Sequence, residues 1–296
     1  MSRLSRATPA VRPALKARLM ISGPAGGGKT WTALSIAEVL TEHGRILVID
    51  TEKESALTYA DNFTFDHLPW HPPFDPRELA ATVMEAGETY DCVIVDSASH
   101  FWTGSGGTLD IAEGRFTGWK AARPAQADLV DAILQAKSHV IICARSKMEH
   151  VQETDPATGR QVVRKLGMAP QQDNTLEYEL NLAVELDLDH RMIVSKSRTV
   201  AVPVGQQYTA GHEKDLAVAY QAWLASGEPP LAGQAVDALK ARLAALSEHQ
   251  RAWAREEWQR EGLPRPEFLR ESQMGAVEAV LAAAEARGAG QQERSA

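Results

Sequence analysis

Residues 23 to 30 read Gly-Pro-Ala-Gly-Gly-Gly-Lys-Thr, which matches the pattern G-x-x-x-x-G-K-[ST]. The residues before it, 17–22, have the apolar character of a short strand, and residues 32–40 place apolar side chains at helical spacing. Glycines let the backbone point several N–H groups at a phosphate, and the N-terminus of the following helix adds partial positive charge. The stretch therefore predicts a phosphate-binding loop rather than a chance glycine-rich turn.

Two side chains of this loop have predicted roles in binding a nucleoside triphosphate. The Lys29 ammonium is expected to reach the β- and γ-phosphates, and the Thr30 hydroxyl to hold Mg²⁺. The residues expected to contact the nucleotide are Gly23, Pro24, Ala25, Gly26, Gly27, Gly28, Lys29, Thr30 and Trp31.

Composition limits the class of protein. The chain has 296 residues, 44% of them hydrophobic, which allows one large or two smaller domains with a sizeable core. The net charge of -8 argues against nucleic-acid binding through bulk charge but leaves a local patch open. Cys92 and Cys143 lie within apolar runs, as small core residues of a reducing compartment do. No apolar run reaches the roughly 18 residues of a membrane span, so we expect a cytoplasmic protein without a membrane partner.

Strand and helix patterns alternate from about residue 17 to 225, which predicts an α/β domain with a mostly parallel sheet. Continuous apolar runs, typical of strands covered on both faces, lie at 19–21, 46–49, 92–95 and 140–143. Residues 180–188 and 191–196 alternate with period two and predict an antiparallel hairpin late in the core.

The expected organisation is a basic N-terminal arm or solvated lead-in at 1–16, the core at 17–226, a small helical module at 231–286 and a disordered tail at 287–296. The module divides into three helical patterns at 231–246, 247–262 and 272–286. Other expected features are an irregular proline-rich loop at 68–76, a helix at 77–88, a mobile loop at 99–108 and a hairpin or long loop at 151–172.

Acidic residues follow two of the apolar runs. Asp96 ends the run at 92–95, where a buried carboxylate is costly unless it serves an ion, so we expect it to join Thr30 in holding Mg²⁺. The alternative is an aspartate that caps the next turn. Past the second run, Glu52 lies within an acidic cluster at the edge where open α/β sheets bind ligands, and it could polarise an attacking water. A solvated charged turn is the other interpretation.

The order of these features resembles the RecA-like recombinase ATPases. A phosphate loop precedes an apolar strand ending Ile-Asp-Thr-Glu (49–52), then Ala56 and Tyr59, then a strand ending in Asp96. The resemblance implies a RecA-like P-loop NTPase fold, ATP and Mg²⁺ as ligands, and Glu52 as the catalytic base. It also places Arg145, where the family usually has an amide, at the position that senses the γ-phosphate.

The same resemblance implies an oligomer. RecA-like filaments place two basic residues, one apart on a late strand, against the ATP of the neighbouring subunit, and Lys196 and Arg198 stand at the matching place. A ring or filament with ATP at subunit interfaces is therefore implied, in which Lys196 and Arg198 complete catalysis. An ordinary charged strand end is the other interpretation.

A narrower resemblance rests on five motifs. Gly-Pro-Ala-Gly-Gly-Gly-Lys-Thr, Ile-Asp-Thr-Glu, Val-Asp-Ser, Ala-Arg-Ser-Lys-Met-Glu and Lys-Ser-Arg-Thr together are similar to short phage-encoded AAA-type or RecA-like ATPases, over about residues 17–200. Some members of that group are single-strand annealing recombinases. The similarity implies an ATP-hydrolysing protein of phage DNA metabolism, acting on single-stranded DNA in a bacterial cell. The alternative is an ATPase switch or assembly factor that binds no DNA.

Basic and aromatic side chains suited to stacking bases and contacting phosphates occur in three places. They are Phe101, Trp102, Arg115, Phe116, Trp119 and Lys120 in and after 99–118; Arg160, Arg164 and Lys165 in 150–175; and Trp253 and Trp258 with Arg251, Arg255, Arg260, Arg265 and Arg270 near the C-terminus. For Trp102 and Trp119, covering the domain's own core is an equally good interpretation. For the C-terminal set we favour a three-helix core with a solvated face over a strand- or partner-binding module.

Overall fold

The structure is a computed structural model, which describes residues 10–115, 117–154 and 161–292. It divides into two units: Lys16–Leu224, and residues 10–15 together with those from Ala225 onwards. Each unit buries its own hydrophobic cluster.

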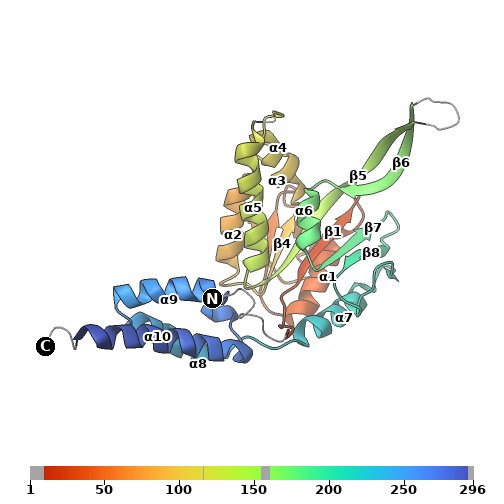
Figure 1. Cartoon of the computed structure of the whole chain (residues 1–296). Coiled ribbons are helices and arrows are strands. Elements are labelled where there is room, and N and C mark those ends of the chain that lie inside the picture. Colours follow the sequence, from red (N-terminus) through yellow and green to blue (C-terminus); the bar gives the residue numbers. More distant parts are fainter. Residues whose placement is uncertain (1–9, 116, 155–160, 293–296) are drawn as a thin grey trace. The chain divides into compact units, whose positions relative to one another are not determined.

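A single path of paired strands runs through the larger unit in the order β3-β2-β4-β5-β1-β7-β8-β9 (Figure 1). The strands are β1 (Arg18–Gly23), β2 (Ile46–Asp50), β3 (Asp66–Pro69), β4 (Cys92–Asp96), β5 (His139–Thr154), β6 (Gln161–Pro170), β7 (Leu182–Leu186), β8 (Met192–Ser197) and β9 (Gln207–Tyr208). The pairs from β3 to β7 along this path are parallel, whereas β7 with β8 and β8 with β9 are antiparallel. A mostly parallel sheet with a late antiparallel hairpin is therefore confirmed.

The strand β5 continues beyond the sheet and pairs there with β6 in antiparallel register, from Ser146 opposite Pro170 to Thr154 opposite Gln161. The two strands project from the body of the unit (Figure 1). Of the two interpretations of this region, the hairpin is confirmed. Arg160 lies outside the described residues, as do the side chains of Arg164 and Lys165.

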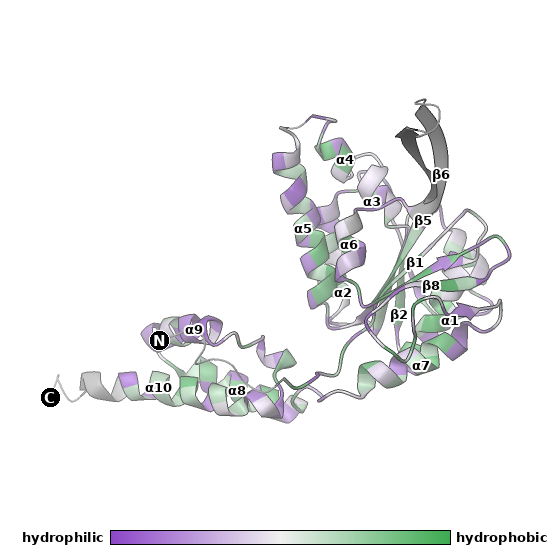
Figure 2. Cartoon of the chain, turned by 45° about the vertical axis from the view of Figure 1, so that its right-hand side comes forward, coloured by the Kyte–Doolittle hydropathy of each residue, from purple (hydrophilic) through white to green (hydrophobic). Residues whose placement is uncertain are grey.

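Helices cover both faces of the sheet. The helices α2 (Pro76–Ala86), α5 (Trp119–Gln135) and α6 (Asn174–Glu179) lie on one side, and α1 (Lys29–Thr41) and α7 (Glu213–Ala225) on the other (Figure 1). Successive strand residues face opposite sides, so both faces of a covered strand must be apolar. Every residue of β1, β2 and β4 is buried, and Figure 2 shows β1 and β2 largely in hydrophobic colours. Cys92 and Cys143 are free and buried, as expected.

The segment 99–108 is not the expected mobile loop. It forms α3 (Ser99–Thr103) and the start of α4 (Thr108–Ile111), and Phe101 is buried in the core cluster. A Cβ on Gly107 would lie 2.9 Å from the carbonyl oxygens of Gly104, His100 and Phe101. This glycine therefore permits close backbone packing in an ordered segment, although a stretch rich in glycine and serine is typical of a mobile loop.

The proline-rich stretch at 68–76 is also more ordered than expected at its start. Leu68 and Pro69 belong to β3, which pairs in parallel with β2 from Leu47 opposite Asp66 to Asp50 opposite Pro69. Because β3 is an edge strand, a proline at its end leaves no interior ladder bond unmade. The expected helix at 77–88 is α2, which begins at Pro76 behind an Asp75 cap.

Buried polar side chains tie the start of β1 to the end of α5. The Arg18 guanidinium donates to the carbonyl oxygens of Leu134, Ala136 and Ser138, and thereby satisfies C-terminal carbonyls of the helix and the turn after it. His139 Nδ1 accepts from the Ala17 N–H at 3.0 Å, which requires that nitrogen to be unprotonated. Burial, with the nearby charges of Lys16 and Arg18, lowers the pKa of His139 to about 3.

This histidine should make folding pH-dependent. Between an ordinary pKa near 6.5 and about 3, the unfolded chain binds a proton that the folded state excludes, so stability is present above pH 6.5 and falls as the pH is lowered. From pH 7 to 4.5 the wild-type protein should lose about 3 kcal/mol more unfolding free energy than His139→Gln, whose amide oxygen can still accept from Ala17. Urea unfolding at both pH values measures this difference. Parallel losses in the two proteins would contradict the assignment.

The second unit is built on α8 (Gly233–Ala245), α9 (Glu248–Arg260) and α10 (Met274–Gln292). These helices correspond to the three helical patterns of the sequence, and they bury Val236, Leu239, Leu269, Val277 and Leu281 together. The helix α10 continues to Gln292, past the expected start of a disordered tail at 287. Residues 293–296 lie outside the described residues.

Residues 12–14 of the expected basic arm are paired in the structure. Ala14 N donates to Glu228 O at 2.7 Å, and Glu228 N donates to Arg12 O at 2.8 Å. A Cβ on Gly227 would lie 2.1 Å from the Pro13 carbonyl, so the approach requires glycine. This part of the arm therefore belongs to the smaller unit, and residues 1–9 lie outside the described residues.

None of the described helices is both long and apolar enough to cross a bilayer.

Candidate nucleotide site

The loop between β1 and α1 has the conformation that its glycines allow. Gly26 and Gly28 have φ values of 77° and 87°, in the left-handed region that other residues avoid. Lys29 begins α1 and donates from Nζ to the carbonyl oxygens of Gly23 and Pro24 at 3.2 and 2.9 Å. The loop thus curls around the ammonium at the N-terminus of a helix, where an anion is favoured.

Thr30 and Asp96 meet at the centre of the site. Asp96 is buried at the end of β4, and Thr30 Oγ1 donates to its Oδ2 at 2.5 Å. Burial raises the pKa of Asp96 to about 6, although the hydrogen bond from Thr30 opposes this shift. A hydroxyl beside a carboxylate is a donor set that a hard cation such as Mg²⁺ prefers, and a bound cation would favour the charged form of Asp96. The residues present therefore fit the ion.

Glu52 is held by the turn that follows β2. The buried Asp50 carboxylate accepts from the N–H groups of Glu52 at 2.6 Å and Ala56 at 3.1 Å, so it fixes the turn. This structural role of Asp50 had no signal in the sequence beyond the acidic cluster. Glu54 lies at the same turn but does not line the pocket.

The Glu52 carboxylate forms a two-pronged ion pair with Arg145. Arg145 Nε donates to Oε1 at 2.8 Å, and the second prong joins Nη2 to Oε2. Burial alone would raise the pKa of Glu52, but the hydrogen bond and charge of Arg145 hold it below its usual value. Arg145 is also fixed by its backbone, whose N–H donates to Ser99 Oγ at 2.9 Å.

Further polar contacts join the ends of β2 and β4. Thr51 Oγ1 accepts from the Ser97 N–H at 2.7 Å and lies 2.6 Å from His100 Nδ1. The His100 ring stacks on Phe74, with 5.1 Å between centroids. These contacts hold Glu52 and Asp96 at fixed positions on neighbouring strands.

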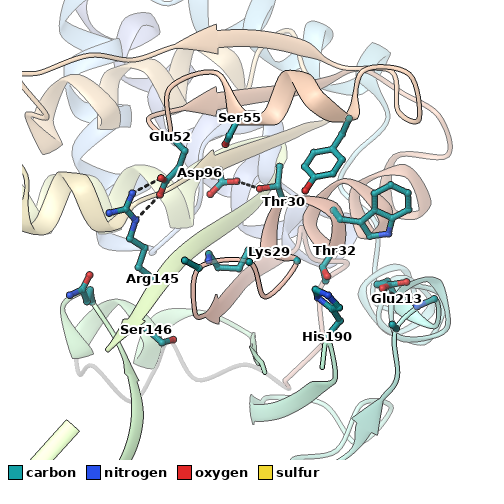
Figure 3. A pocket seen from close by; sticks show the side chains of 18 residues that line it. Lys29, Thr30, Thr32, Glu52, Ser55, Asp96, Arg145, Ser146, His190 and Glu213 are labelled. Carbon is teal, nitrogen blue, oxygen red and sulfur yellow. Dashed lines mark hydrogen bonds and ion pairs between the residues drawn. The ribbon is translucent and has the colours of Figure 1, made fainter. Parts of the chain in front are cut away.

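Lys29, Thr30, Glu52, Asp96 and Arg145 are among the residues that line a pocket of about 910 Å³ (Figure 3). Of the residues predicted from the sequence, the pocket brings together Ala25, Gly26, Gly28, Lys29, Thr30, Trp31, Glu52, Asp96 and Arg145. Trp31 is 38% exposed and packs edge-on against Tyr59 and Phe63, with centroids 5.8 and 4.9 Å away. Gly23, Pro24 and Gly27 shape the loop without lining the pocket.

Lys196 and Arg198 do not line this pocket. Both donate to the carbonyl oxygen of Tyr178, and Lys196 also donates to that of Glu177, at the end of α6. Burial, and then the charge of Arg198, lowers the pKa of Lys196. A role in a neighbour's site stays a prediction, and it requires these two side chains to leave the carbonyls of α6.

The structure adds pocket residues that the sequence analysis did not assign. Tyr59, Gln171, His190 and Glu213 line the wall. His190 lies in the β7–β8 turn, and a Cβ on Gly28 would lie 3.1 Å from its Nδ1. No local pattern marks Gln171, His190 or Glu213, because only the strand order brings them to the loop at 23–30.

A family model described as an AAA domain, AAA_24, matches residues 15–213, which contain every lining residue of the pocket. The chain belongs to the AAA_24 family. Its larger unit is thus a P-loop ATPase domain of the AAA type. No curated protein sequence matches the chain.

Among solved structures, the chain is similar to the KaiC-like protein PH0186 from the hyperthermophilic archaeon Pyrococcus horikoshii OT3. The two are 13% identical, with a TM-score of 0.41, over 67% of this chain and 84% of that protein.

Proposed function

We propose that this AAA_24 protein is a Mg²⁺-dependent ATPase. The observation that carries the proposal is the convergence on one pocket of Lys29 and Thr30 from the start of α1, Asp96 from the end of β4, and Glu52 from the turn after β2 (Figure 3). Phosphate binding, cation binding and base chemistry are the functions that nucleotide hydrolysis requires.

Different residues of the chain have different roles in the proposed hydrolysis. Backbone N–H groups of 26–30 and the Lys29 ammonium hold the phosphates, for which Lys29 exchanges its present carbonyl partners for phosphate oxygens. Glu52 orients the attacking water and accepts its proton at a carboxylate oxygen. Thr30 and Asp96 would hold Mg²⁺, which when bound neutralises charge on the phosphates.

Arg145 should set the acidity of Glu52. In Arg145→Gln, the partner that holds the pKa of Glu52 down is lost while burial still raises it. The acidic limb of the kcat–pH profile should therefore move to higher pH. Profiles of the wild-type protein and the variant at saturating ATP measure this shift. If the acidic limb of the variant's profile lies at the same pH as that of the wild-type protein, the Glu52–Arg145 ion pair does not set the pKa that controls turnover.

We further propose that ATP turnover is coupled to single-stranded DNA in recombination, as in the phage-encoded proteins that this sequence resembles. Support comes from Trp102 and Trp119, whose half-buried rings lie 6.1 Å apart beside the exposed Lys120 and Arg123. Both tryptophans line a cavity of about 550 Å³, so part of their surface is open to a base. Phe116 lies outside the described residues.

A second candidate, a nucleotide switch that binds no DNA, is favoured by the charge of the same cavity. Asp131, Asp173 and Glu179 line it with Arg123. Carboxylates repel a phosphate backbone, so strand binding there requires the basic residues around Trp119 to outweigh them.

In either case we propose a homo-oligomer in which Lys196 and Arg198 of one subunit approach ATP bound to its neighbour. Their placement supports this, because Lys196 lies near the end of β8, Arg198 follows directly after the strand, and both donate to the carbonyl oxygen of Tyr178, so the two cationic groups lie close together.

One ATPase assay with and without oligo-dT, across protein concentration, tests these proposals. The DNA proposal expects stimulation by oligo-dT that weakens as salt rises. The oligomer proposal expects specific activity to rise with protein concentration. Turnover indifferent to oligo-dT would favour the switch, and absence of turnover under all conditions would contradict the ATPase assignment.

A further inference from the structure

The helical C-terminal unit carries a groove that the ATPase proposal does not use. It has a volume of about 480 Å³ and lies between α8, α9 and the turn after α9. Its walls include Leu243, Arg251, Arg255, Trp258, Leu263 and Arg265. We refer to these residues as the arginine-rimmed groove.

The rim of this groove is cationic. Arg251 and Arg255 are exposed and lie one helical turn apart on α9, with Arg265 across from them in the following turn. Within the described part of the chain, neither Arg251 nor Arg255 has an ion-pair partner, and no carboxylate lines the groove. The rim therefore favours an anionic ligand even though the whole chain is acidic.

Two nearby acids of this unit, Glu257 and Glu267, already have cationic partners. Glu257 pairs with Arg260 at 2.6 Å, and Glu267 pairs with Lys240 at 2.5 Å. Neither pair includes a residue that lines the groove, so neither neutralises Arg251 or Arg255.

The floor of the groove is apolar. Leu243, Trp258 and Leu263 pack against the buried cluster of the unit, and Ala254 beneath them is 2% exposed. The indole Nε1–H of Trp258 donates to Pro264 O at 2.8 Å, so it is not available to a ligand. A nucleobase placed here would lose water from its polar edges without gaining hydrogen bonds from the floor, which is costly. An aromatic or large aliphatic side chain carries no such cost.

From the cationic rim and the apolar floor we infer that the arginine-rimmed groove docks an acidic peptide segment of a partner protein. The segment's carboxylates contact Arg251, Arg255 and Arg265, and an aromatic side chain fills the floor against Trp258. This is the arrangement in which a buried anchor supplies affinity and charge pairs at the rim supply specificity.

The test measures binding of a fluorescein-labelled poly-aspartate peptide ending in phenylalanine to the full-length protein by fluorescence anisotropy. Saturable binding should weaken on the order of tenfold or more in Arg251→Glu/Arg255→Glu, and by a similar factor when the phenylalanine of the peptide is replaced by serine. Circular dichroism checks that the variant folds, and the serine peptide probes the floor without altering the protein.

The charge-matched control is Arg115→Glu/Lys120→Glu, which should bind the peptide as the wild-type protein does. The ATPase proposal is separable, because Arg251→Glu/Arg255→Glu should turn over ATP at the wild-type rate. Peptide binding that is absent, or unchanged in Arg251→Glu/Arg255→Glu, would overturn the inference. So would loss of oligo-dT binding in that variant without peptide binding by the wild-type protein, since the groove would then serve nucleic acid.

Discussion

Replacing Glu52 with glutamine should lower kcat for ATP hydrolysis on the order of a hundredfold or more, with nucleotide affinity close to that of the wild-type protein. The amide keeps the size of the side chain and its reach toward the pocket, but it cannot accept the proton of the attacking water. Affinity should persist because, in the proposed site, Lys29 and the loop amides hold the phosphates without help from Glu52. Phosphate release under steady state gives kcat, and titration with a fluorescent ATP analogue gives affinity.

The matched control for this variant is Glu54→Gln. Glu54 occupies the same acidic turn, yet it does not line the pocket, so its amide variant should hydrolyse ATP at the wild-type rate. Tight binding with full turnover in Glu52→Gln, together with a loss in Glu54→Gln, would transfer the role of base to Glu54 and contradict the assignment made from the pocket.

Removing the ammonium of Lys29 should have an effect at least as large. Lys29→Ala should reduce ATP turnover by a factor on the order of 10² to 10³ or more, because a positive charge aimed at the transferring phosphate is lost. The fold should be unaffected, since the hydrogen bonds of the ammonium to described residues go to the carbonyl oxygens of Gly23 and Pro24, which water can satisfy instead. A malachite-green assay measures turnover, and a thermal melt checks the fold.

Lys53→Ala is the matched control, because it also removes one lysine charge from the neighbourhood of the pocket. Lys53 is an exposed lysine next to Glu52, and it does not line the pocket, so its loss should leave turnover unchanged. If Lys29→Ala hydrolyses ATP at the wild-type rate, the loop at 23–30 does not bind the phosphates that are cleaved.

The features that the sequence predicts correctly are those that depend on interactions between residues close together in the sequence. Gly26 and Gly28 mark a loop that must adopt positive φ, and Lys29 starts the helix that follows it. The buried strand β4 is identifiable because both of its faces are covered, and Asp96 stands out because a carboxylate ends an apolar run. Such signals need no knowledge of the rest of the chain.

Features that depend on tertiary packing were missed. The segment 99–108 has the composition of a mobile loop, whereas its Gly107 permits three carbonyl groups to approach closely within an ordered turn. His190 and Glu213 reach the pocket only because β7 lies beside β1, a pairing across about 160 residues of sequence that no local pattern encodes. The Glu52–Arg145 ion pair arises in the same way, because Arg145 follows the part of β5 that lies beside β4.

The most direct test of the nucleotide site is a crystal structure of the protein with Mg²⁺ and a non-hydrolysable ATP analogue. The proposal expects the triphosphate within the loop at 23–30, the metal ion between Thr30 and Asp96, and Glu52 facing the γ-phosphate. An analogue bound elsewhere on the chain, with Lys29 still bonded to Gly23 and Pro24, would contradict it.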